Sequence, residues 1–357
     1  MRLSLELLQK ENIVKLAPME CFTSCLMTYI KMSGEDPSVM LLDYWNLHYK
    51  FKTLISSKDA RQLKVGRFFD IDMTLVRGNK ETLEVELAKG NSVIFLCKAS
   101  QLSYFPSSML GLEDSGFQHS ILICGREQGE TEGDKVVDPM LDYIGSVSMQ
   151  DLVSAGSRGN GTELLYFKLT KLAQAFQRST INEIVSNCAE RNLKYYEQTI
   201  NAKPGLSETN QASAASKEAE WMEWFSNRQG GAEALVRFAE DARQSLSWTS
   251  KSRKGWIDRN LLTITAIIQI RQQVWKQFCQ SQILSEEVVR SGEASMDQIV
   301  KGWKSLHFKL IKYKTITDGF PGQIDAITQT ADHIRNEELQ ILRRMAAIGE
   351  SLKESAE

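Results

Sequence analysis

The sequence predicts an α+β domain over residues 1–170 followed by an all-helical domain over residues 171–357. The length of 357 residues suggests about two domains, at ~150 residues per domain. Before residue 170 there are short β-rich runs, and Gly, Pro, Asn or Asp residues bound them, as is usual for strands. After it, long stretches have apolar residues at three- and four-residue spacing, which predicts helices, and only Pro204 and Pro321 interrupt them.

The first half begins with an apolar segment of helical spacing, Cys21–Gly34, which closes on a glycine that is typical of a helix end. A second helix is expected over Ser38–Phe51. Four strands follow, expected over Ser92–Ala99, His119–Glu127, Asp134–Pro139 and Glu163–Thr170. Because the helices come first and the strands then follow one another, the order indicates an antiparallel sheet.

The second half contains the clearest helical patterns. Leu261–Leu284 has apolar residues near the 3.6-residue period, and Gln323–Ser355 is expected to be a long terminal amphipathic helix. That terminal helix would allow a homodimer. The small and polar segment Ala202–Ser216 is expected to be a loop or linker.

Composition and charge exclude several classes of protein. The 43 Lys and Arg residues against 45 Asp and Glu residues give a net charge of −2, whereas nucleic-acid binding needs a basic excess. No run approaches the ~18 apolar residues that span a membrane. Glu6 and Lys10 interrupt the N-terminal segment where a signal peptide is apolar, so we expect a cytoplasmic protein. Six cysteines without a CxxC pair are typical of reduced thiols, and without a phosphate-binding Gly-rich loop or a metal-ligand cluster we expect no cofactor.

Three residues could form a catalytic site. Cys21 opens the first predicted helix, where the positive end of the helix dipole and unpaired amides favour a thiolate. His119 opens a predicted strand, and Asp138 ends the next one. Two adjacent antiparallel strands would place these side chains together, so that Asp138 could fix the His119 tautomer. The order of Cys, His and Asp is the one that a papain-like nucleophile, base and orienting residue require.

Each of these residues, taken alone, is more often structural. Cys25 is a rival nucleophile one turn later on the same helix face, although its place inside the helix favours core packing. Cys97 and Cys124 lie inside apolar strand runs and are expected to be core residues.

The segments that contain these residues resemble the papain-like domain of the butirosin biosynthesis protein H family. The matching segments are CFTSCLMTYIKMSGED, FQHSILICG and KVVDP, and the resemblance covers roughly residues 15–170. The same segments are more distantly similar to the cysteine peptidase domains that cut double-glycine leader peptides. The helical half has the size expected of the family's C-terminal domain.

This resemblance implies acyl transfer. Proteins of that family accept an acyl group from the phosphopantetheine arm of a carrier protein and pass it to an amine, which forms an amide in natural-product biosynthesis. Carried over residue by residue, Cys21 would be the nucleophile, His119 the general base and acid, and Asp138 the orienting residue.

One departure from the leader peptidases concerns the oxyanion. Those enzymes place a Gln a few residues before the nucleophile, whereas this chain has Lys15, Met19 and Glu20 in that region. Only the backbone N–H of Cys21 can therefore be named as an oxyanion donor. The missing Gln also weakens the interpretation as a peptidase.

Carrier proteins are usually acidic, so basic segments of the helical half are candidate docking surfaces. One segment contributes Lys301, Lys304, Lys309, Lys312 and Lys314, and a second contributes Lys251, Arg253, Lys254 and Arg259. Charges at such spacing also commonly form a solvated helix face. Two other functions fit the same sequence: a cysteine peptidase or amidase with water as the acceptor, and a non-catalytic scaffold whose helical half binds partners.

Overall fold

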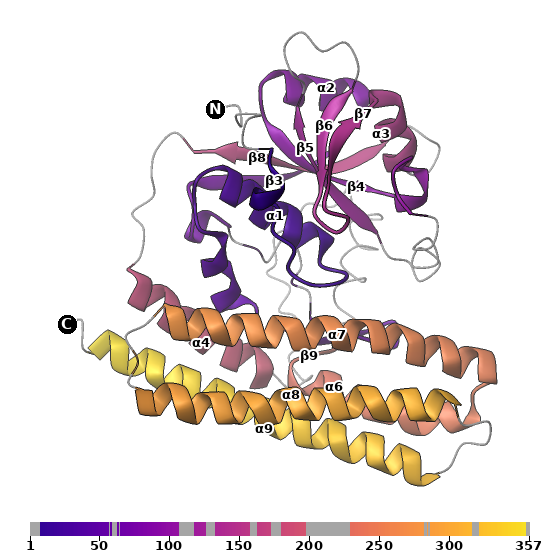
Figure 1. The fold of residues 1–357 in the computed structure, drawn as a ribbon, viewed down its shortest axis with the longest axis vertical. Coiled ribbons are helices and arrows are strands. Elements are labelled where there is room, and N and C mark those ends of the chain that lie inside the picture. The colour runs from indigo at the N-terminus through magenta and orange to yellow at the C-terminus, as the bar shows by residue number, and fades with distance from the viewer. Residues whose placement is uncertain are drawn as a thin grey trace, which may run out of the picture. The chain divides into compact units, whose positions relative to one another are not determined.

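The computed structural model of the chain describes residues 8–56, 58, 63, 65–106, 118–125, 133–157, 163–172, 180–197, 229–281, 284, 286–315 and 321–354. The chain divides into two compact units, whose elements Figure 1 labels. Residues 1–40 and 58–179 form the sheet unit, and residues 41–57 and 180–357 form the helical unit. The stretch 41–57 thus groups with residues that follow it much later in the chain. The linker predicted over Ala202–Ser216 lies outside the described residues.

The sheet unit contains a six-stranded sheet in the order β3-β8-β4-β5-β6-β7, in which all neighbouring strands are antiparallel. The strands are β3 (Ile71–Gly78), β4 (Ser92–Cys97), β5 (His119–Gly125), β6 (Asp134–Asp138), β7 (Tyr143–Val147) and β8 (Leu164–Lys171). Every residue of the central strands β4 and β5 is buried, which explains their continuous apolar runs. The predicted α+β class is confirmed at this level.

Three helices of this unit pack on the sheet, as Figure 1 shows. α1 (Cys21–Met32) runs mainly against β5, while α2 (Lys80–Ala88) and α3 (Met149–Gly156) share a hydrophobic core with β4 and β5. The side chains of Asn79 and Ser148 cap α2 and α3, because each accepts a hydrogen bond from a first-turn amide.

The sequence predicts four of these strands but misses β3 and β7. Both are edge strands of the sheet, and most of their side chains are partly or fully exposed. β7 lacks a regular alternation of apolar and polar residues, whereas β3 begins with one over Ile71–Leu75, so this signal was present in the sequence.

The prediction of a helix over Ser38–Phe51 is wrong. The segment forms a 3-10 helix, Pro37–Asp43, and then strand β1 (His48–Lys50), which pairs with β2 (Thr53–Ile55) and β9 (Gln229–Gly230) in a second sheet. Phe51 and Lys52 have φ angles of 48° and 59°, as the two central residues of a tight hairpin turn require. Because β9 lies far away in the sequence, no local pattern indicates this pairing.

The helical unit consists mostly of long helices. They are α4 (Ile181–Glu197), α6 (Ala232–Gln244), α7 (Ser250–Gln280), α8 (Glu286–Thr315) and α9 (Pro321–Glu354). The terminal helix agrees closely with the prediction, whereas α7 begins well before the predicted Leu261, because Thr249 caps it by accepting from the amide of Ser252. In the part of the chain that the structure describes, the helices are too short or too polar for a transmembrane segment.

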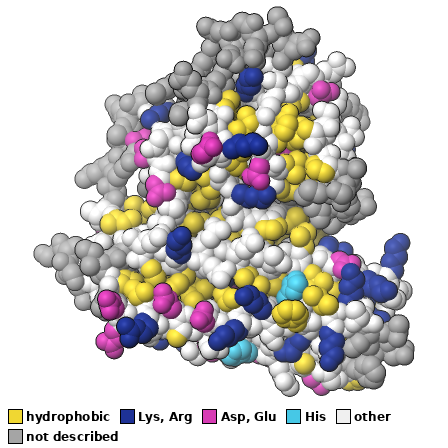
Figure 2. All heavy atoms as spheres, in the orientation of Figure 1, with side chains coloured by type: hydrophobic (Ala, Val, Ile, Leu, Met, Phe, Trp, Pro, Cys, Tyr) yellow, Lys and Arg dark blue, Asp and Glu magenta, His cyan; other side chains and the backbone are white. Residues whose placement is uncertain are grey.

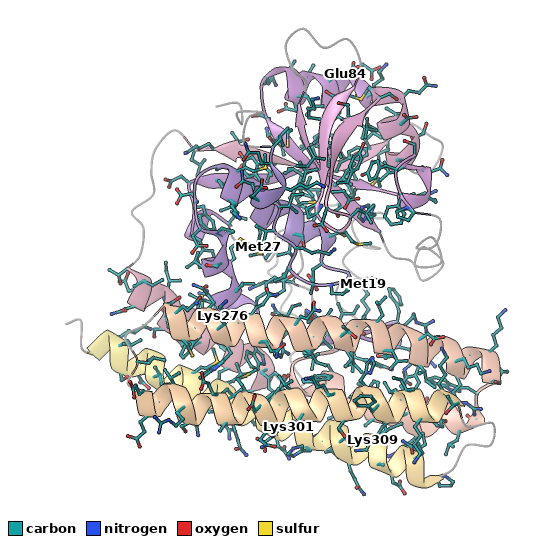
Figure 3. The ribbon with its side chains drawn as sticks, viewed as in Figure 1. Met19, Met27, Glu84, Lys276, Lys301 and Lys309 are labelled. Atoms are coloured by element: carbon teal, nitrogen blue, oxygen red, sulfur yellow. The ribbon has the colours of Figure 1, made fainter. Side chains whose placement is uncertain are left out.

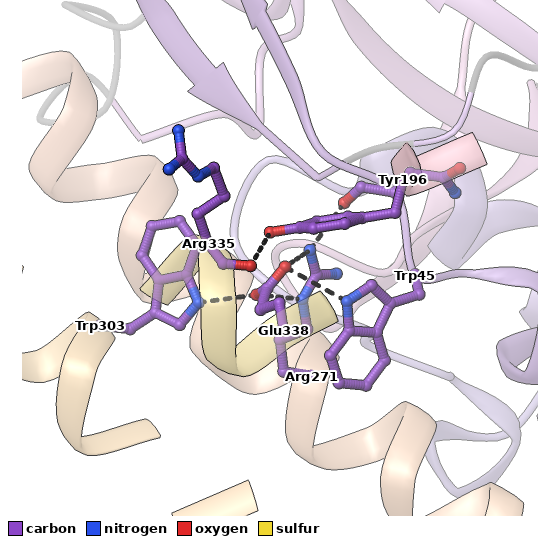
Figure 4. Close-up of polar contacts among 7 residues, drawn as sticks. Trp45, Tyr196, Arg271, Trp303, Arg335 and Glu338 are labelled. Atoms are coloured by element: carbon purple, nitrogen blue, oxygen red, sulfur yellow. Dashed lines mark hydrogen bonds and ion pairs between the residues drawn. The ribbon is translucent and has the colours of Figure 1, made fainter. Parts of the chain in front are cut away.

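A buried polar cluster joins the helices of this unit (Figure 4). The ion pair between Arg271 and Glu338 is fully buried, with 2.8 Å between Nε and Oε1. The indole N–H groups of Trp45 and Trp303 donate to the two oxygens of Glu338, at 3.2 and 2.8 Å. Arg271 also donates to the carbonyl of Asn46 at 3.2 Å, so the cluster ties the stretch 41–57 to α7, α8 and α9.

Candidate active site

Cys21 is the first residue of α1, and the preceding segment is fixed to that helix. The amide of Leu16 donates to Ser24 Oγ, and the amide of Val14 donates to Thr28 Oγ1, at 3.2 and 3.0 Å. Met19, labelled in Figure 3, has a φ of 70°, a conformation that turns the chain sharply into the helix at some cost in backbone strain. These contacts and this turn place Cys21 at the helix N-terminus.

The Cys21 thiol lies next to the start of β5. Its Sγ is 3.8 Å from the carbonyl oxygen of Gln118, the residue immediately before His119, and the side chain is 4% exposed. The Cys21 amide belongs to the first helical turn, whose N–H groups have no acceptor within the helix. A reacting carbonyl at the thiol would therefore meet at least one backbone donor.

His119 and Asp138 form a fully buried ion pair. Their strands β5 and β6 are antiparallel neighbours, and His119 Nε2 lies 2.7 Å from Asp138 Oδ2. The other oxygen of Asp138, Oδ1, accepts a hydrogen bond from the Met140 amide at 3.1 Å, just after the strand ends. The expected placement of these two side chains on neighbouring strands is confirmed.

Aromatic side chains surround this pair. Tyr104 donates its hydroxyl to Asp138 Oδ2 at 3.4 Å and stacks on Tyr143, with 3.8 Å between the ring centroids. Phe105 contacts the His119 ring edge-on, with centroids 5.3 Å apart. The carboxylate is thus held by a histidine, a tyrosine and an amide, and the imidazole is restricted by a neighbouring ring.

The protonated form of His119 is strongly favoured. Burial by itself lowers the pKa of His119, but hydrogen bonds to Asp138 and Cys21, and the charges of both, outweigh burial and raise this pKa from 6.5 to about 10. Nε2 is held by Asp138, so Nδ1 is the ring nitrogen that would exchange a proton with the Cys21 thiol.

The other cysteines near the sheet have environments that suit inert thiols. Cys25 is fully buried, its Sγ donates to the Ser120 carbonyl at 3.4 Å, and burial raises the pKa of its thiol well above the usual value. Burial likewise raises the pKa of Cys124 to about 12. Cys97, on β4 opposite His119, is also buried. The prediction that these three cysteines are core residues agrees with their burial.

The structure thus brings together Cys21, His119 and Asp138, which the sequence singled out. It adds Tyr104 and the Met140 amide, which the sequence did not indicate. Tyr104 lies between β4 and β5, in a stretch with no periodic pattern, and 34 positions separate it from Asp138. Only the folded chain makes them neighbours, so no sequence signal for Tyr104 existed.

Within the described residues, no group of three or more His, Cys, Asp or Glu side chains is arranged to hold a metal ion. The titratable groups that converge here are a thiol, an imidazole and a carboxylate, and this set suits nucleophilic catalysis with general acid and base assistance. No protein-family model matches the chain, and a comparison with curated proteins gives no match either.

Proposed function

We propose that this chain is a cysteine-dependent acyltransferase with a papain-like catalytic domain. In this proposal it moves an acyl group from the phosphopantetheine thioester of a carrier protein to an amine, and the product is an amide. The observation that supports it most is the buried pair of His119 and Asp138 beside Cys21, whose Sγ lies 3.8 Å from the carbonyl oxygen of Gln118, the residue before His119. The resemblance of the three surrounding segments to the butirosin biosynthesis protein H family supplies the choice of donor and acceptor.

The first half of the reaction forms an acyl-enzyme. The His119 imidazolium holds the proton that the Cys21 thiol has given up, Cys21 Sγ attacks the thioester carbonyl carbon, and a tetrahedral intermediate forms. The Cys21 amide would stabilise its oxyanion. The bond to the pantetheine sulfur then breaks, and the imidazolium returns the proton to that sulfur, which leaves an acyl group on Cys21 and a free pantetheine thiol.

The second half repeats these steps with an amine as the nucleophile. The amine nitrogen attacks the acyl carbon, His119 takes the amine proton, and the carbon–sulfur bond to Cys21 breaks. The proton stays on His119 beside the released Cys21 sulfur, so the products are an amide and the starting enzyme. Throughout, Asp138 holds the imidazole in one orientation and stabilises its cation.

Transfer to an amine requires that water be a poor competitor. His119 and Asp138 are fully buried and Cys21 is almost so, which supports a site with restricted access for water. A peptidase or amidase would use the same three side chains with water as the acceptor.

The proposal is tested with an acylated carrier protein and a set of primary amines, with products identified by mass spectrometry. We expect an amide in the presence of an amine and no amide from the Cys21→Ala variant. Free acid in the same amount with or without amine would show a hydrolase instead. Products that are unchanged in Cys21→Ala would rule out both enzymes and leave the scaffold function.

A further inference from the structure

The last turns of α8 expose hydrophobic side chains among lysines. Phe308 is 67% exposed and Ile311 39% exposed, and both are on the same face of the helix as Lys301, Lys304 and Lys312. We call these five residues the basic face. Figure 3 labels Lys301 on α8, and Figure 2 shows Lys and Arg side chains beside hydrophobic ones on the helical unit.

Within the described residues, Lys301, Lys304 and Lys312 make no ion pair, and the α8 sequence contains no acidic residue after Asp297. The two neighbouring lysines differ. Lys309 donates to Ser305 and Thr330, at 3.0 and 2.6 Å. Lys314 pairs with Asp258 of α7.

The helix dipole accounts for Lys312, which lies in the last turn of α8, but not for Lys301 and Lys304. Basic residues stabilise a helix only within its last turn, and α8 ends at Thr315. Lys301 and Lys304 lie about three turns or more before that end. An exposed phenylalanine also gains nothing from solvent, so its place among three unpaired lysines favours a surface that a partner covers.

The two basic segments that the sequence indicated separately meet in the structure. The Arg253 guanidinium, in the first turn of α7, lies over the Tyr313 ring of α8 at 5.6 Å. Lys251 and Lys254, both exposed, share that turn. The two basic segments therefore lie on neighbouring helices, but Tyr313 itself is buried and is not part of the basic face.

The surface around Phe308 is hollowed. Lys301, Lys304, Ser305, Phe308, Lys309 and Lys312 line a shallow depression of about 450 Å³. An aromatic residue at the centre of a ring of charged groups is the usual arrangement of a docking surface, with an apolar centre and a polar rim. The complementary partner has carboxylates around an apolar side chain.

We propose that the basic face is the docking surface for the acidic carrier protein that delivers the acyl group. This inference rests on the proposed function for the identity of the partner. Lys301, Lys304 and Lys312 attract the partner's carboxylates, while Phe308 and Ile311 contact its apolar side chain. Charge steers the encounter, so reversing the lysines acts mainly on the association rate.

The test measures binding of a fluorescently labelled, phosphopantetheinylated acyl carrier protein to the full chain. Lys301→Glu/Lys304→Glu/Lys312→Glu should weaken binding by about tenfold or more, and Phe308→Ala by about fivefold. Lys276→Glu is the matched control for one charge reversal, because Lys276 is an exposed lysine of α7 away from the basic face (Figure 3), and it should change binding by less than about twofold.

A second measurement separates this inference from the proposed function. A small acyl thioester needs no docking, so its reaction with Cys21 should proceed at the same rate in the wild type and the triple variant. Loss of the carrier-dependent reaction alone in the triple variant supports docking.

Equal carrier binding by the wild type and the triple variant overturns the docking proposal, even if Cys21 reacts. Binding of the wild type to anionic phospholipid vesicles but not to the carrier protein would also overturn it. If the carrier binds as expected but Cys21 never reacts, the proposed function fails and the docking surface stands.

Discussion

Among the residues that the structure describes, each unit buries one ion pair completely, and the two pairs differ in what surrounds the carboxylate. In the helical unit, Glu338 accepts hydrogen bonds from Arg271, Trp45 and Trp303. In the sheet unit, Asp138 holds His119, whose ring also interacts with the Cys21 thiol. Both pairs are 0% exposed, so burial alone does not distinguish them.

The difference lies in the cation. An arginine stays protonated at all ordinary pH values, so Arg271 can only hold its partner in place. A histidine can give and take a proton, and His119 lies close to Cys21, whose thiol is at a helix N-terminus. A buried ion pair therefore suggests chemistry only where one member can titrate and contacts a reactive group.

The largest expected effect is on the rate of Cys21 acylation, when the Asp138 carboxylate is changed to an amide. Asp138→Asn should lower the rate of Cys21 acylation about 10²–10⁴-fold, because the imidazole loses its orientation and the stabilisation of its cation. Single-turnover acylation measured by mass spectrometry gives the rate. Glu338→Gln is the matched control in the helical unit and should leave the rate of the folded protein within about threefold. Equal losses in both variants would remove the distinction between the pairs.

The free energy of unfolding should show the opposite order, with the larger loss in Glu338→Gln than in Asp138→Asn. Glu338→Gln leaves the Arg271 cation buried without its counter-ion, which should lower the free energy of unfolding by about 3–5 kcal/mol. Denaturant titration measures this change. Replacing both members, Arg271→Met with Glu338→Leu, should recover part of the loss because no lone charge remains. A single variant as stable as the wild type would show that the cluster does not hold this unit together.

The sheet-unit pair should also make stability depend on pH. The pKa of His119 is raised by folding from 6.5 to about 10, so the pair contributes its full stabilisation below about pH 6.5 and loses it as pH rises through about 10. The difference in unfolding free energy between the wild type and His119→Gln should therefore shrink by a few kcal/mol over that range. A difference that is independent of pH would mean that His119 is not charged in the folded protein.

The smallest effect is expected at Tyr104. Removing its hydroxyl in Tyr104→Phe takes one hydrogen bond from Asp138, and we expect about a three- to tenfold loss of the acylation rate. The pH profile should shift as well, because the freed carboxylate oxygen holds the His119 proton more strongly. Tyr143→Phe is the control, since it keeps the stacked ring. An unshifted profile in Tyr104→Phe would limit Tyr104 to packing.

The sequence analysis placed His119 and Asp138 on neighbouring strands, as the structure has them, but it missed parts of the fold around them. Cys21, His119 and Asp138 each stand at the end of a local element, where a glycine, a proline or a change of pattern marks the boundary, so their positions could be predicted one by one. β3 was missed although it begins with alternating apolar and polar residues, and β1 was taken for a helix although its partner β2 follows directly; only the pairing of β1 with β9 is remote in the sequence.

Contacts between distant segments explain the remaining differences. Tyr104 reaches Asp138, and Trp45 reaches Glu338 across most of the chain, through hydrogen bonds that no local spacing encodes. The two basic segments also looked independent, since only the packing of α7 against α8 makes them neighbours.

The central claim is that Cys21, activated by His119, is the nucleophile. Intact-protein mass spectrometry after incubation with a small acyl thioester, and in parallel with an acylated carrier protein, tests it most directly. We predict an acyl adduct in the wild type and in Cys25→Ala, and none in Cys21→Ala. An adduct that persists in Cys21→Ala but disappears in Cys25→Ala, or no adduct with either donor in any form of the protein, would contradict the account.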